Sequence, residues 1–528
     1  MFRTPRGMRD IVGEEMDFWC WVEDTVRRVF ESFGYRRVET PIFEHFDLFA
    51  LRSGEEIRNR MFVFRIDEGE VALRPEITAS IARLVSSGLE GALPYRLYYI
   101  GRCFRYEEPQ SGRYREFWQA GVELIGSGRP EADAELLILA YEVAENVGLR
   151  GFNLKIGDMS IIRGLLEDFN VPVEVQNRII TPLDKLSSST DRLRVFLRKV
   201  ESGQKLDGWE VKELARIADS LRMWRIKEAE KISAGSSKIP REHWEFIEED
   251  PRIYLLEELN SRGKARELGN FIYDTMEGLR KALMLEWAYN GVDTAGGKYL
   301  LDPKASNMLF DLIGISGTPS KCLSEVDALV KDLERTADSV ERFKRIIGLV
   351  DEAGLRFTVD FGLARGLEYY TGMVFEIDYP GLGAEKQICG GGRYDQLIQE
   401  FGGRSTPALG FGYGLDRLVL AAMDSNLKPV VPSNRLFLVL ISPDVAGYAL
   451  KVARMLHQVV NITFDLKIRG VREGLSYASK KGYRYAAIIG RSEKESGKVT
   501  IKDLQSGRQE TLPLDGVVDY LVLRDEEN

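Results

Sequence analysis

The 528-residue sequence is poor in the side chains that bind metals or form disulfides. It has four cysteines and three histidines, and no cysteine lies in a C-x-x-C pair or near a histidine. This spacing argues against a zinc site or a disulfide framework, and it fits a reducing cytoplasm. No histidine stands beside a candidate nucleophile, which argues against covalent catalysis by a Ser/His/Asp or Cys/His arrangement. The residues concerned are Cys20, Cys103, Cys322, Cys389, His45, His243 and His457.

Long apolar runs are also missing. The sequence has neither a signal-peptide pattern nor a run of about 18 apolar residues, so secretion and membrane spanning are unsupported and we expect a cytoplasmic protein. A composition with 44% hydrophobic and 29% charged residues is that of a globular protein. The length of 528 residues predicts about three domains.

Positive charge is not in excess, because the formal net charge is −9. Phosphate binding requires lysine and arginine, so this value is unfavourable for a nucleic-acid partner. The charge is unevenly distributed, however, and segments 102–115 and 467–494 are locally rich in lysine and arginine. Each segment is either a nucleic-acid-binding surface or a solvated charged face, and the sequence leaves both open.

The N-terminal region predicts a helix followed by a strand. Apolar residues recur at helical spacing over 17–33, and Gly34 stands at the position of a C-terminal cap. The next run, YRRVETPIFE at 35–44, favours a strand that is interrupted by Pro41.

Residues 95–107 and 116–125 predict two strands joined by a turn around 109–113. Side chains alternate between the two faces of a strand. Arg105 and Glu107 therefore share one face of the first strand, as Gln119 and Glu123 share one face of the second. We expect these polar groups to point together.

A charged, helix-rich region between about 160 and 345 predicts an inserted domain. Its GVDTAGGKYLL run at 291–301 is not a phosphate loop, because the glycine spacing differs and Tyr299 follows Lys298 where Ser or Thr is required. After Pro432 strands and helices alternate, which predicts a small, mostly parallel sheet of the doubly wound type.

Three separated runs carry a family resemblance. GLARGLEYYTGMVFE at 362–376 resembles the histidine-specific signature of the histidyl-tRNA synthetases. FRYEEPQSGRYREFWQAGVELIG at 104–126 and ALGFGYGLDRLVL at 408–420 look like motifs 2 and 3 of class II aminoacyl-tRNA synthetases. The helix and strand of 17–44 look like class II motif 1, and the C-terminal run resembles the end of the family's anticodon-binding domain. The resemblance covers nearly everything except the insertion, which is longer here than in the family.

The resemblance implies an α+β fold, with a class II antiparallel sheet and flanking helices, a helical insertion domain and a C-terminal α/β anticodon-binding domain. It also implies a homodimer that is built on motif 1. The expected bounds are 1–165 and 346–430 for the two parts of the catalytic domain, 166–345 for the insertion and 434–528 for the anticodon-binding domain.

The implied activity joins histidine and ATP to histidyl-adenylate and then transfers histidine to the 3′ end of tRNA(His), with Mg²⁺ on the ATP phosphates. Guanidinium groups suit such a site, because their planar forks bind phosphate and carboxylate and stay charged. By resemblance Arg105 contacts the α-phosphate, Arg417 the γ-phosphate, and Arg365 the reacting centre. In isolation each arginine is equally consistent with an exposed or salt-bridged side chain. The resemblance adds five ATP-binding candidates: Glu107, Arg113, Gly410, Gly412 and Gly414.

The three glycines of GFGYG leave one face of a strand without side chains, so that a flat base could lie there. Close packing of another backbone explains such a pattern equally well. The following LDRL makes the match to motif 3 better, with Asp416 where many relatives have glutamate.

Selecting histidine requires partners for the one donor and the one acceptor of a neutral imidazole. The resemblance implies that the imidazole N–H donates to the carboxylate of Glu123. It also implies that the other ring nitrogen accepts a hydrogen bond from the Tyr370 hydroxyl. The remaining predicted contacts are pocket walls at Tyr369 and Tyr394 and an ammonium site at Glu76, Thr78 and Gln119.

Contacts with tRNA are predicted for Gln110 and Arg115, in and just after the motif 2 turn, and no protein metal site is predicted. The alternative is a paralogue with the same catalytic fold, the non-catalytic regulatory subunit of ATP phosphoribosyltransferase. That paralogue lacks the C-terminal domain and key arginines, whereas Arg105, Arg365 and Arg417 are present here. A pure RNA-binding module leaves the pocket residues without a role.

Overall fold

The computed structural model describes residues 2–51, 60–109, 112–247, 256–363, 369–427 and 435–523. The chain forms two compact units, residues 1–427 and 428–528. Among the described helices, none is both long enough and apolar enough to cross a membrane.

The first unit is built on a mixed sheet to which nine strands of the described residues belong. The six central strands pair antiparallel, while the outer pairs β1–β5 and β7–β11 are parallel. In spatial order the strands are β1 (Arg36–Arg37), β5 (Tyr95–Phe104), β6 (Glu116–Ile125), β14 (Ala408–Gly414), β13 (Gln387–Arg393), β12 (Met373–Asp378), β7 (Asn153–Asp158), β11 (Phe357–Asp360) and β10 (Ser316–Gly317).

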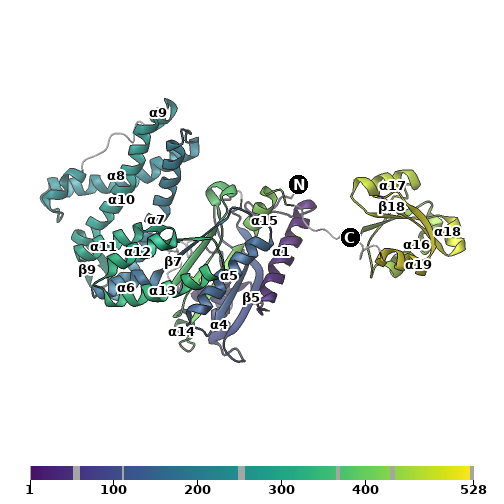
Figure 1. The fold of residues 1–528 in the computed structure, drawn as a ribbon, viewed down its shortest axis with the longest axis horizontal. Helices are drawn as coiled ribbons and strands as arrows, with labels where there is room; N and C mark the ends of the chain where they lie inside the picture. The colour runs from purple at the N-terminus through teal and green to yellow at the C-terminus, as the bar shows by residue number, and fades with distance from the viewer. Residues whose placement is uncertain are drawn as a thin grey trace. The chain divides into compact units, whose positions relative to one another are not determined.

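Helices cover this sheet and bury their apolar faces against it (Figure 1). The predicted N-terminal helix is confirmed as α1, which ends before Gly34, a residue with φ +81°. Glycine adopts this φ without a Cβ clash, so the helix ends here at little cost in conformational free energy. The helices packed here include α1 (Glu14–Ser32), α5 (Pro130–Asn146), α6 (Met159–Asp168), α13 (Glu334–Glu352) and α15 (Leu415–Asp424).

The strand expected at 35–44 is interrupted near Pro41, as predicted, but its two parts belong to different sheets. Its first part is β1, whereas its second part is β2 (Phe43–His45), which pairs with β4 (Gly69–Leu73) in a separate sheet. The chain changes sheet at Thr40 and Pro41, where Arg74 donates a hydrogen bond of 2.8 Å to the Thr40 carbonyl. Proline has no N–H to continue a ladder, which is why the strand ends there. The elements around this small sheet are β3 (Val63–Ile66), α2 (Phe46–Ala50), α4 (Thr78–Ser86) and α14 (Leu397–Glu400).

The middle of the chain is helical, as expected. Four helices share an apolar cluster that includes Leu193, Leu214 and Phe271, whereas Leu309 and Phe343 further along belong to the cluster of the large sheet. The run at 291–301, whose sequence does not fit a phosphate loop, contains a hairpin of β8 and β9. The elements are α7 (Val173–Glu201), α8 (Gly208–Ser233), η1 (Arg241–Ile247), α9 (Leu256–Ser261), α10 (Ala265–Leu285), η3 (Glu286–Asn290), β8 (Val292–Thr294), β9 (Gly297–Tyr299), α11 (Pro303–Gly314) and α12 (Pro319–Val330).

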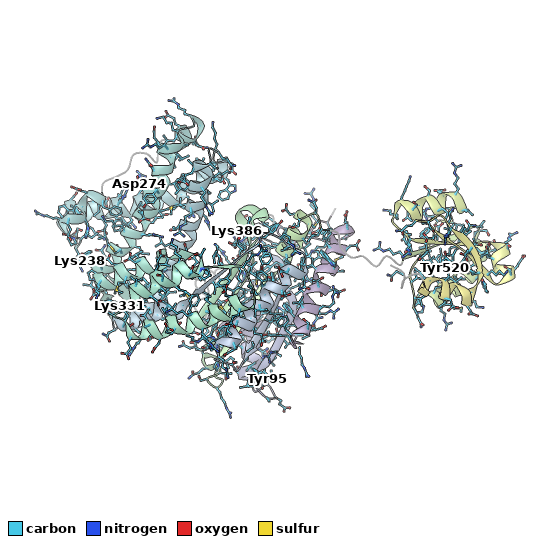
Figure 2. All side chains as sticks on the ribbon, viewed as in Figure 1. Tyr95, Lys238, Asp274, Lys331, Lys386 and Tyr520 are labelled. Atoms are coloured by element: carbon cyan, nitrogen blue, oxygen red, sulfur yellow. The ribbon has the colours of Figure 1, made fainter. Side chains whose placement is uncertain are left out.

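The C-terminal unit is an α/β domain with the spatial strand order β16-β15-β17-β18-β19. Only β16, β15 and β17 are parallel, and β18 and β19 add antiparallel, so the expectation of a mostly parallel sheet holds for three strands. Tyr520 lies among the side chains that fill this unit, 6.4 Å from the ring of Tyr485 (Figure 2). The elements are β15 (Arg435–Leu440), α16 (Ala446–Leu456), β16 (Asn461–Phe464), α17 (Val471–Lys480), β17 (Tyr485–Ile489), α18 (Arg491–Ser496), β18 (Lys498–Asp503), β19 (Gln509–Pro513) and α19 (Leu514–Leu523).

Candidate active site

The alternation of side chains divides the central strands into a helix face and an open face. On the helix face, Phe30 of α1 packs 5.6 Å from Tyr98 of β5 and 5.9 Å from Phe411 of β14. The residues that follow Tyr98 and Phe411 along the strands, Tyr99 and Gly412, therefore lie on the open face. The predicted ligands of β6 and β14 lie on this open face. Arg105 and Glu107, in contrast, come after β5, which ends at Phe104 and not at 107 as predicted.

A cavity of about 190 Å³ opens on this face. It is lined by residues from β5 and β6, from β13 and β14, and from the starts of α4 and α15. The predicted site residues that line it are Glu76, Thr78, Arg105, Glu107, Arg113, Gln119, Tyr369, Tyr370, Tyr394, Gly410, Gly412, Gly414 and Arg417. Sheet register brings these sequence-distant groups together.

The glycines of β14 differ in what occupies the space where a side chain would lie. Gly410 pairs with Glu123 of β6, and a Cβ at Gly410 would lie 1.7 Å from the Glu123 carboxylate. The sequence predicts a strand face without side chains here, but at Gly410 the carboxylate of Glu123 occupies that space. A Cβ at Gly412 would meet the Tyr99 hydroxyl at 3.3 Å, and one at Gly414 would meet nothing closer than 3.8 Å. These two positions leave room at the cavity wall.

Glu123 is fully buried behind the cavity wall. Thr78 Oγ1 donates to its Oε1 over 2.6 Å, and the Tyr394 hydroxyl donates to its Oε2. Burial raises the pKa of Glu123 to about 8, although both hydrogen bonds oppose this shift. At neutral pH this carboxyl thus keeps a proton that an incoming polar group can displace or exploit.

The same end of the cavity is aromatic and carries a second carboxyl group. The Tyr369 ring lies 4.9 Å from Tyr370 and 5.6 Å from Tyr394. Glu76 is buried, accepts a hydrogen bond of 3.2 Å from the Ala79 N–H, and has its pKa raised by burial. This end suits a flat, partly polar, cationic small molecule.

The other end of the cavity is basic. Arg105 follows β5, and its Nε donates to the Pro75 carbonyl over 2.9 Å while its guanidinium lies 5.2 Å from the Phe117 ring centroid. Within the described part of the chain, no hydrogen-bond partner is found for its two terminal nitrogens. Arg417 Nε donates to the Gly112 carbonyl over 3.0 Å, which fixes α15 to the loop between β5 and β6.

Glu107 lies among these arginines as their counterion. Arg113 donates to one of its oxygens, and Arg60 donates to the other over 3.2 Å. Burial is the largest single influence and raises the pKa of Glu107, but the hydrogen bond from Arg113 and the charges of Arg113, Arg105 and Arg60 together outweigh it, so the net pKa is lowered. An anionic ligand can compete with this carboxylate for Arg113.

Comparison with known proteins decides the family. The model described as histidyl-tRNA synthetase matches residues 7–205 and 274–418, together more than half of the chain. The chain belongs to the histidyl-tRNA synthetase family. A second model, described as an anticodon binding domain, matches residues 435–524. The histidine–tRNA ligase of Methanocaldococcus jannaschii is 33% identical over 528 residues, which cover 98% of this chain and 99% of that protein.

Solved structures agree in fold. The histidyl-tRNA synthetase from Nostoc has a TM-score of 0.65 at 22% identity and covers 99% of both chains. An ATP phosphoribosyltransferase regulatory subunit/histidyl-tRNA synthetase from Bacillus halodurans has a TM-score of 0.59 at 22% identity, covering 91% of this chain and 96% of its own. At such identities the fold alone does not separate the synthetases from the alternative regulatory class. The histidyl-tRNA synthetase model leaves out 206–273, within the predicted insertion.

Four predicted residues are not among the lining groups: Glu123 lies behind the cavity wall, and the others are Arg365, Gln110 and Arg115. Arg365 and Gln110 lie outside the described residues. Arg115 turns its guanidinium over the Tyr106 ring, 3.9 Å from the centroid, and its Nε donates to the Glu107 carbonyl over 3.0 Å. Its predicted tRNA contact stays a prediction.

The sequence reasoning missed Tyr99, Tyr114 and Arg9. Tyr99 lines the cavity and shares the strand face of Gly101, so the same alternation that identified Arg105 could have found it. Tyr114 also lines the cavity, under the guanidinium of Arg9. No local signal marks Arg9, because its contact with Asp416 spans 407 positions.

Proposed function

We propose that the cavity activates L-histidine with ATP. Its aromatic, carboxyl-bearing end would hold the amino acid, and its arginine-rich end would hold the triphosphate. One observation carries this proposal: both chemistries line one cavity of about 190 Å³ in a chain that matches the Methanocaldococcus jannaschii histidine–tRNA ligase over nearly its full length. Substrates held in adjacent halves react as if at very high concentration.

In the proposed step, a carboxylate oxygen of histidine attacks the α-phosphorus. A new P–O bond forms as the bond to the β-phosphate oxygen breaks, and pyrophosphate leaves. The terminal nitrogens of Arg105, which have no hydrogen-bond partner among the described residues, suit the α-phosphate, where charge rearranges most. Arg417 and Arg113 suit the departing phosphates, and Gly412 leaves space for the adenine. Arg365 stays a predicted contact with the reacting centre.

Mg²⁺ belongs to the same proposal as a companion of ATP. It prefers one or two carboxylates together with substrate phosphates. Glu107 fits, because its pKa is lowered and it lines the cavity beside Arg113. The described residues contain no group of three or more His, Cys, Asp or Glu that could hold a metal ion by themselves. The ion would neutralise charge on the leaving pyrophosphate.

Histidine selection is proposed to depend on Glu123 and Tyr370. The imidazole N–H would donate to Glu123, and the Tyr370 hydroxyl would donate to the other ring nitrogen. Glu76, Thr78 and Gln119 would take the ammonium group, with Tyr369 and Tyr394 as walls. A side chain without a ring N–H would leave Glu123 buried without that partner, which penalises it strongly.

The second substrate is proposed to be tRNA(His), whose terminal ribose hydroxyl would attack the adenylate. The match of 435–524 to an anticodon binding domain supports this partner. Gln110, Arg115 and the basic 467–494 segment remain predicted contacts.

A homodimer built on motif 1, residues 17–44, is proposed, and the neighbouring small sheet of β2, β4 and β3 is proposed to extend its interface. Phe43 and Phe64 lie on this sheet side by side, 5.7 Å apart between ring centroids, with 47% and 41% of their surfaces exposed. Exposed aromatic pairs of this kind are typical of interfaces. The cytoplasmic location and the domain bounds 1–165, 166–345, 346–430 and 434–528 also stay predictions.

Aminoacylation tests the proposed function. Purified protein with ATP, Mg²⁺ and a tRNA(His) transcript is expected to esterify labelled histidine to the tRNA. A matched tRNA with another anticodon and acceptor end serves as the control. Absence of charging, together with tight binding to ATP phosphoribosyltransferase, would favour the regulatory class instead.

A further inference from the structure

The segment before α1, residues 2–13, is joined to the loop between β5 and β6. The Gly7 carbonyl accepts a hydrogen bond of 2.8 Å from the Arg115 N–H. The approach is so close that a Cβ at Gly7 would lie 2.8 Å from Arg115 Cγ and 2.9 Å from Pro109 Cγ. Gly7 also has φ +84°, which favours glycine. The backbone of this N-terminal segment is therefore fixed against the loop that carries Arg113.

Arg9 extends this contact to two residues of the cavity wall. Its Nη2 donates to Asp416 Oδ1 over 3.0 Å, and its guanidinium lies 4.4 Å from the Tyr114 ring centroid. Its other terminal nitrogen pairs with Glu15 at the start of α1. Arg9 itself does not line the cavity, whereas Tyr114 and Asp416 do.

Asp416 connects three parts of the site. It is the second residue of α15, next to Arg417, and its Oδ2 accepts a hydrogen bond of 2.9 Å from the Trp118 N–H of β6. Its side chain is only 5% exposed, and that of Arg9 is 23% exposed. A charge-assisted bond to a buried carboxylate is stronger and more directional than an exposed ion pair. The Arg9–Asp416 pair therefore joins the N-terminal segment to the start of α15, directly beside Arg417.

We propose that Arg9 is a positioning residue for ATP, which holds the motif 2 loop and the start of α15 in register so that Arg113 and Arg417 face the same triphosphate. This inference rests on the proposed function. The proposed dependence concerns ATP binding alone, because within the described residues neither Glu76, Glu123 nor Tyr369 of the histidine end contacts Arg9.

The test compares Arg9→Met with Arg6→Met in histidine-dependent pyrophosphate exchange. Arg6 lies in the same N-terminal segment but forms an exposed pair with Glu108, at 71% and 78% side-chain exposure. We expect Arg9→Met to lower kcat/KM for ATP roughly 10- to 100-fold, with the KM for histidine unchanged, because a small displacement of positioned groups costs that much. Arg9→Lys is expected to restore part of the loss, and Arg6→Met to behave as the wild type.

A double-mutant cycle makes the test sharper. If Arg9 acts through Asp416, the Arg9→Met/Asp416→Asn protein loses no more activity than the worse single variant. Additive losses overturn the proposal. So does an Arg9→Met protein that matches Arg6→Met, or one in which the KM values of both substrates rise together with a lower Tm. Wild-type protein without any exchange would instead refute the proposed function, and the role of Arg9 would fall with it.

Discussion

Tyr394 donates a hydrogen bond to Glu123, a carboxyl group 271 positions earlier in the chain. The bond joins the residue that follows β13 to the C-terminal part of β6 across β14, where Gly410 has no side chain to separate them. The buried carboxyl group thus depends on a glycine, a threonine and a tyrosine from separate segments. The predictions below follow from this arrangement and from the arginine-rich end of the cavity.

Glu123→Gln tests histidine recognition. The carboxyl group can release its proton and become a charged acceptor when the imidazole N–H donates to it, whereas the amide cannot. The kcat/KM for histidine is therefore expected to fall by roughly 100-fold or more while the KM for ATP is unchanged. Steady-state pyrophosphate exchange at varied histidine measures this. Glu116→Gln is the matched control, because Glu116 lies on the same strand and pairs with the exposed Arg102. Equal behaviour of the two variants would remove Glu123 from the histidine site.

The stability of the protein should fall as pH rises, and Glu123 should contribute. Its pKa is about 8 in the folded state against 4.5 for an ordinary exposed glutamate, so between these values the folded chain keeps a proton that the unfolded chain releases. The slope of the unfolding free energy is then negative, by at most about 1.4 kcal/mol per pH unit for one proton. Urea midpoints from pH 5 to 8 should decline less in Glu123→Gln than in the wild type. Parallel declines would show that Glu123 is ionised.

Arg105→Ala tests the α-phosphate contact. Removing one positioned donor at a site of changing charge costs about 100- to 1000-fold in kcat. The lost bond to the Pro75 carbonyl costs only about 1 kcal/mol of stability, so the variant should stay folded. Arg102→Ala is the control, since Arg102 is exposed and faces away from the cavity. An unchanged kcat in single-turnover adenylate formation contradicts the role.

Two glycine substitutions should fail in different ways. In Gly410→Ala the new methyl group meets the Glu123 carboxylate at 1.7 Å, which is expected to destabilise the fold by about 1–3 kcal/mol. In Gly412→Ala the nearest atom is 3.3 Å away, so the fold should persist while the KM for ATP rises. Thermal melting and exchange kinetics separate the two cases. Equal Tm values for both variants would argue against the filled site at Gly410.

Much of the cavity could be predicted because local alternation suffices. Strand alternation over 95–107 and 116–125 predicted that Arg105, Glu107, Gln119 and Glu123 would lie together. The strand β5 ends earlier, at Phe104, yet Arg105, Glu107 and Gln119 line the cavity and Glu123 lies behind its wall. The parity rule needs no knowledge of distant contacts.

The rest depends on contacts that local pattern does not encode. That Glu123 fills the space at Gly410 follows from the register of β6 against β14, and the Arg9–Asp416 pair spans 407 positions. The break of the 35–44 strand depends on Arg74 capturing the Thr40 carbonyl, a tertiary contact. Strand propensity likewise predicts that β18 and β19 are strands, but it does not predict that they pair antiparallel with the sheet.

Exchange of labelled pyrophosphate into ATP, measured with each of the twenty amino acids in turn, tests the central claim most directly. Exchange with histidine alone is the expected result, and it should disappear in Arg365→Ala protein that retains the wild-type Tm. Exchange that depends on a different amino acid, or that continues unchanged without Arg365, would contradict the account.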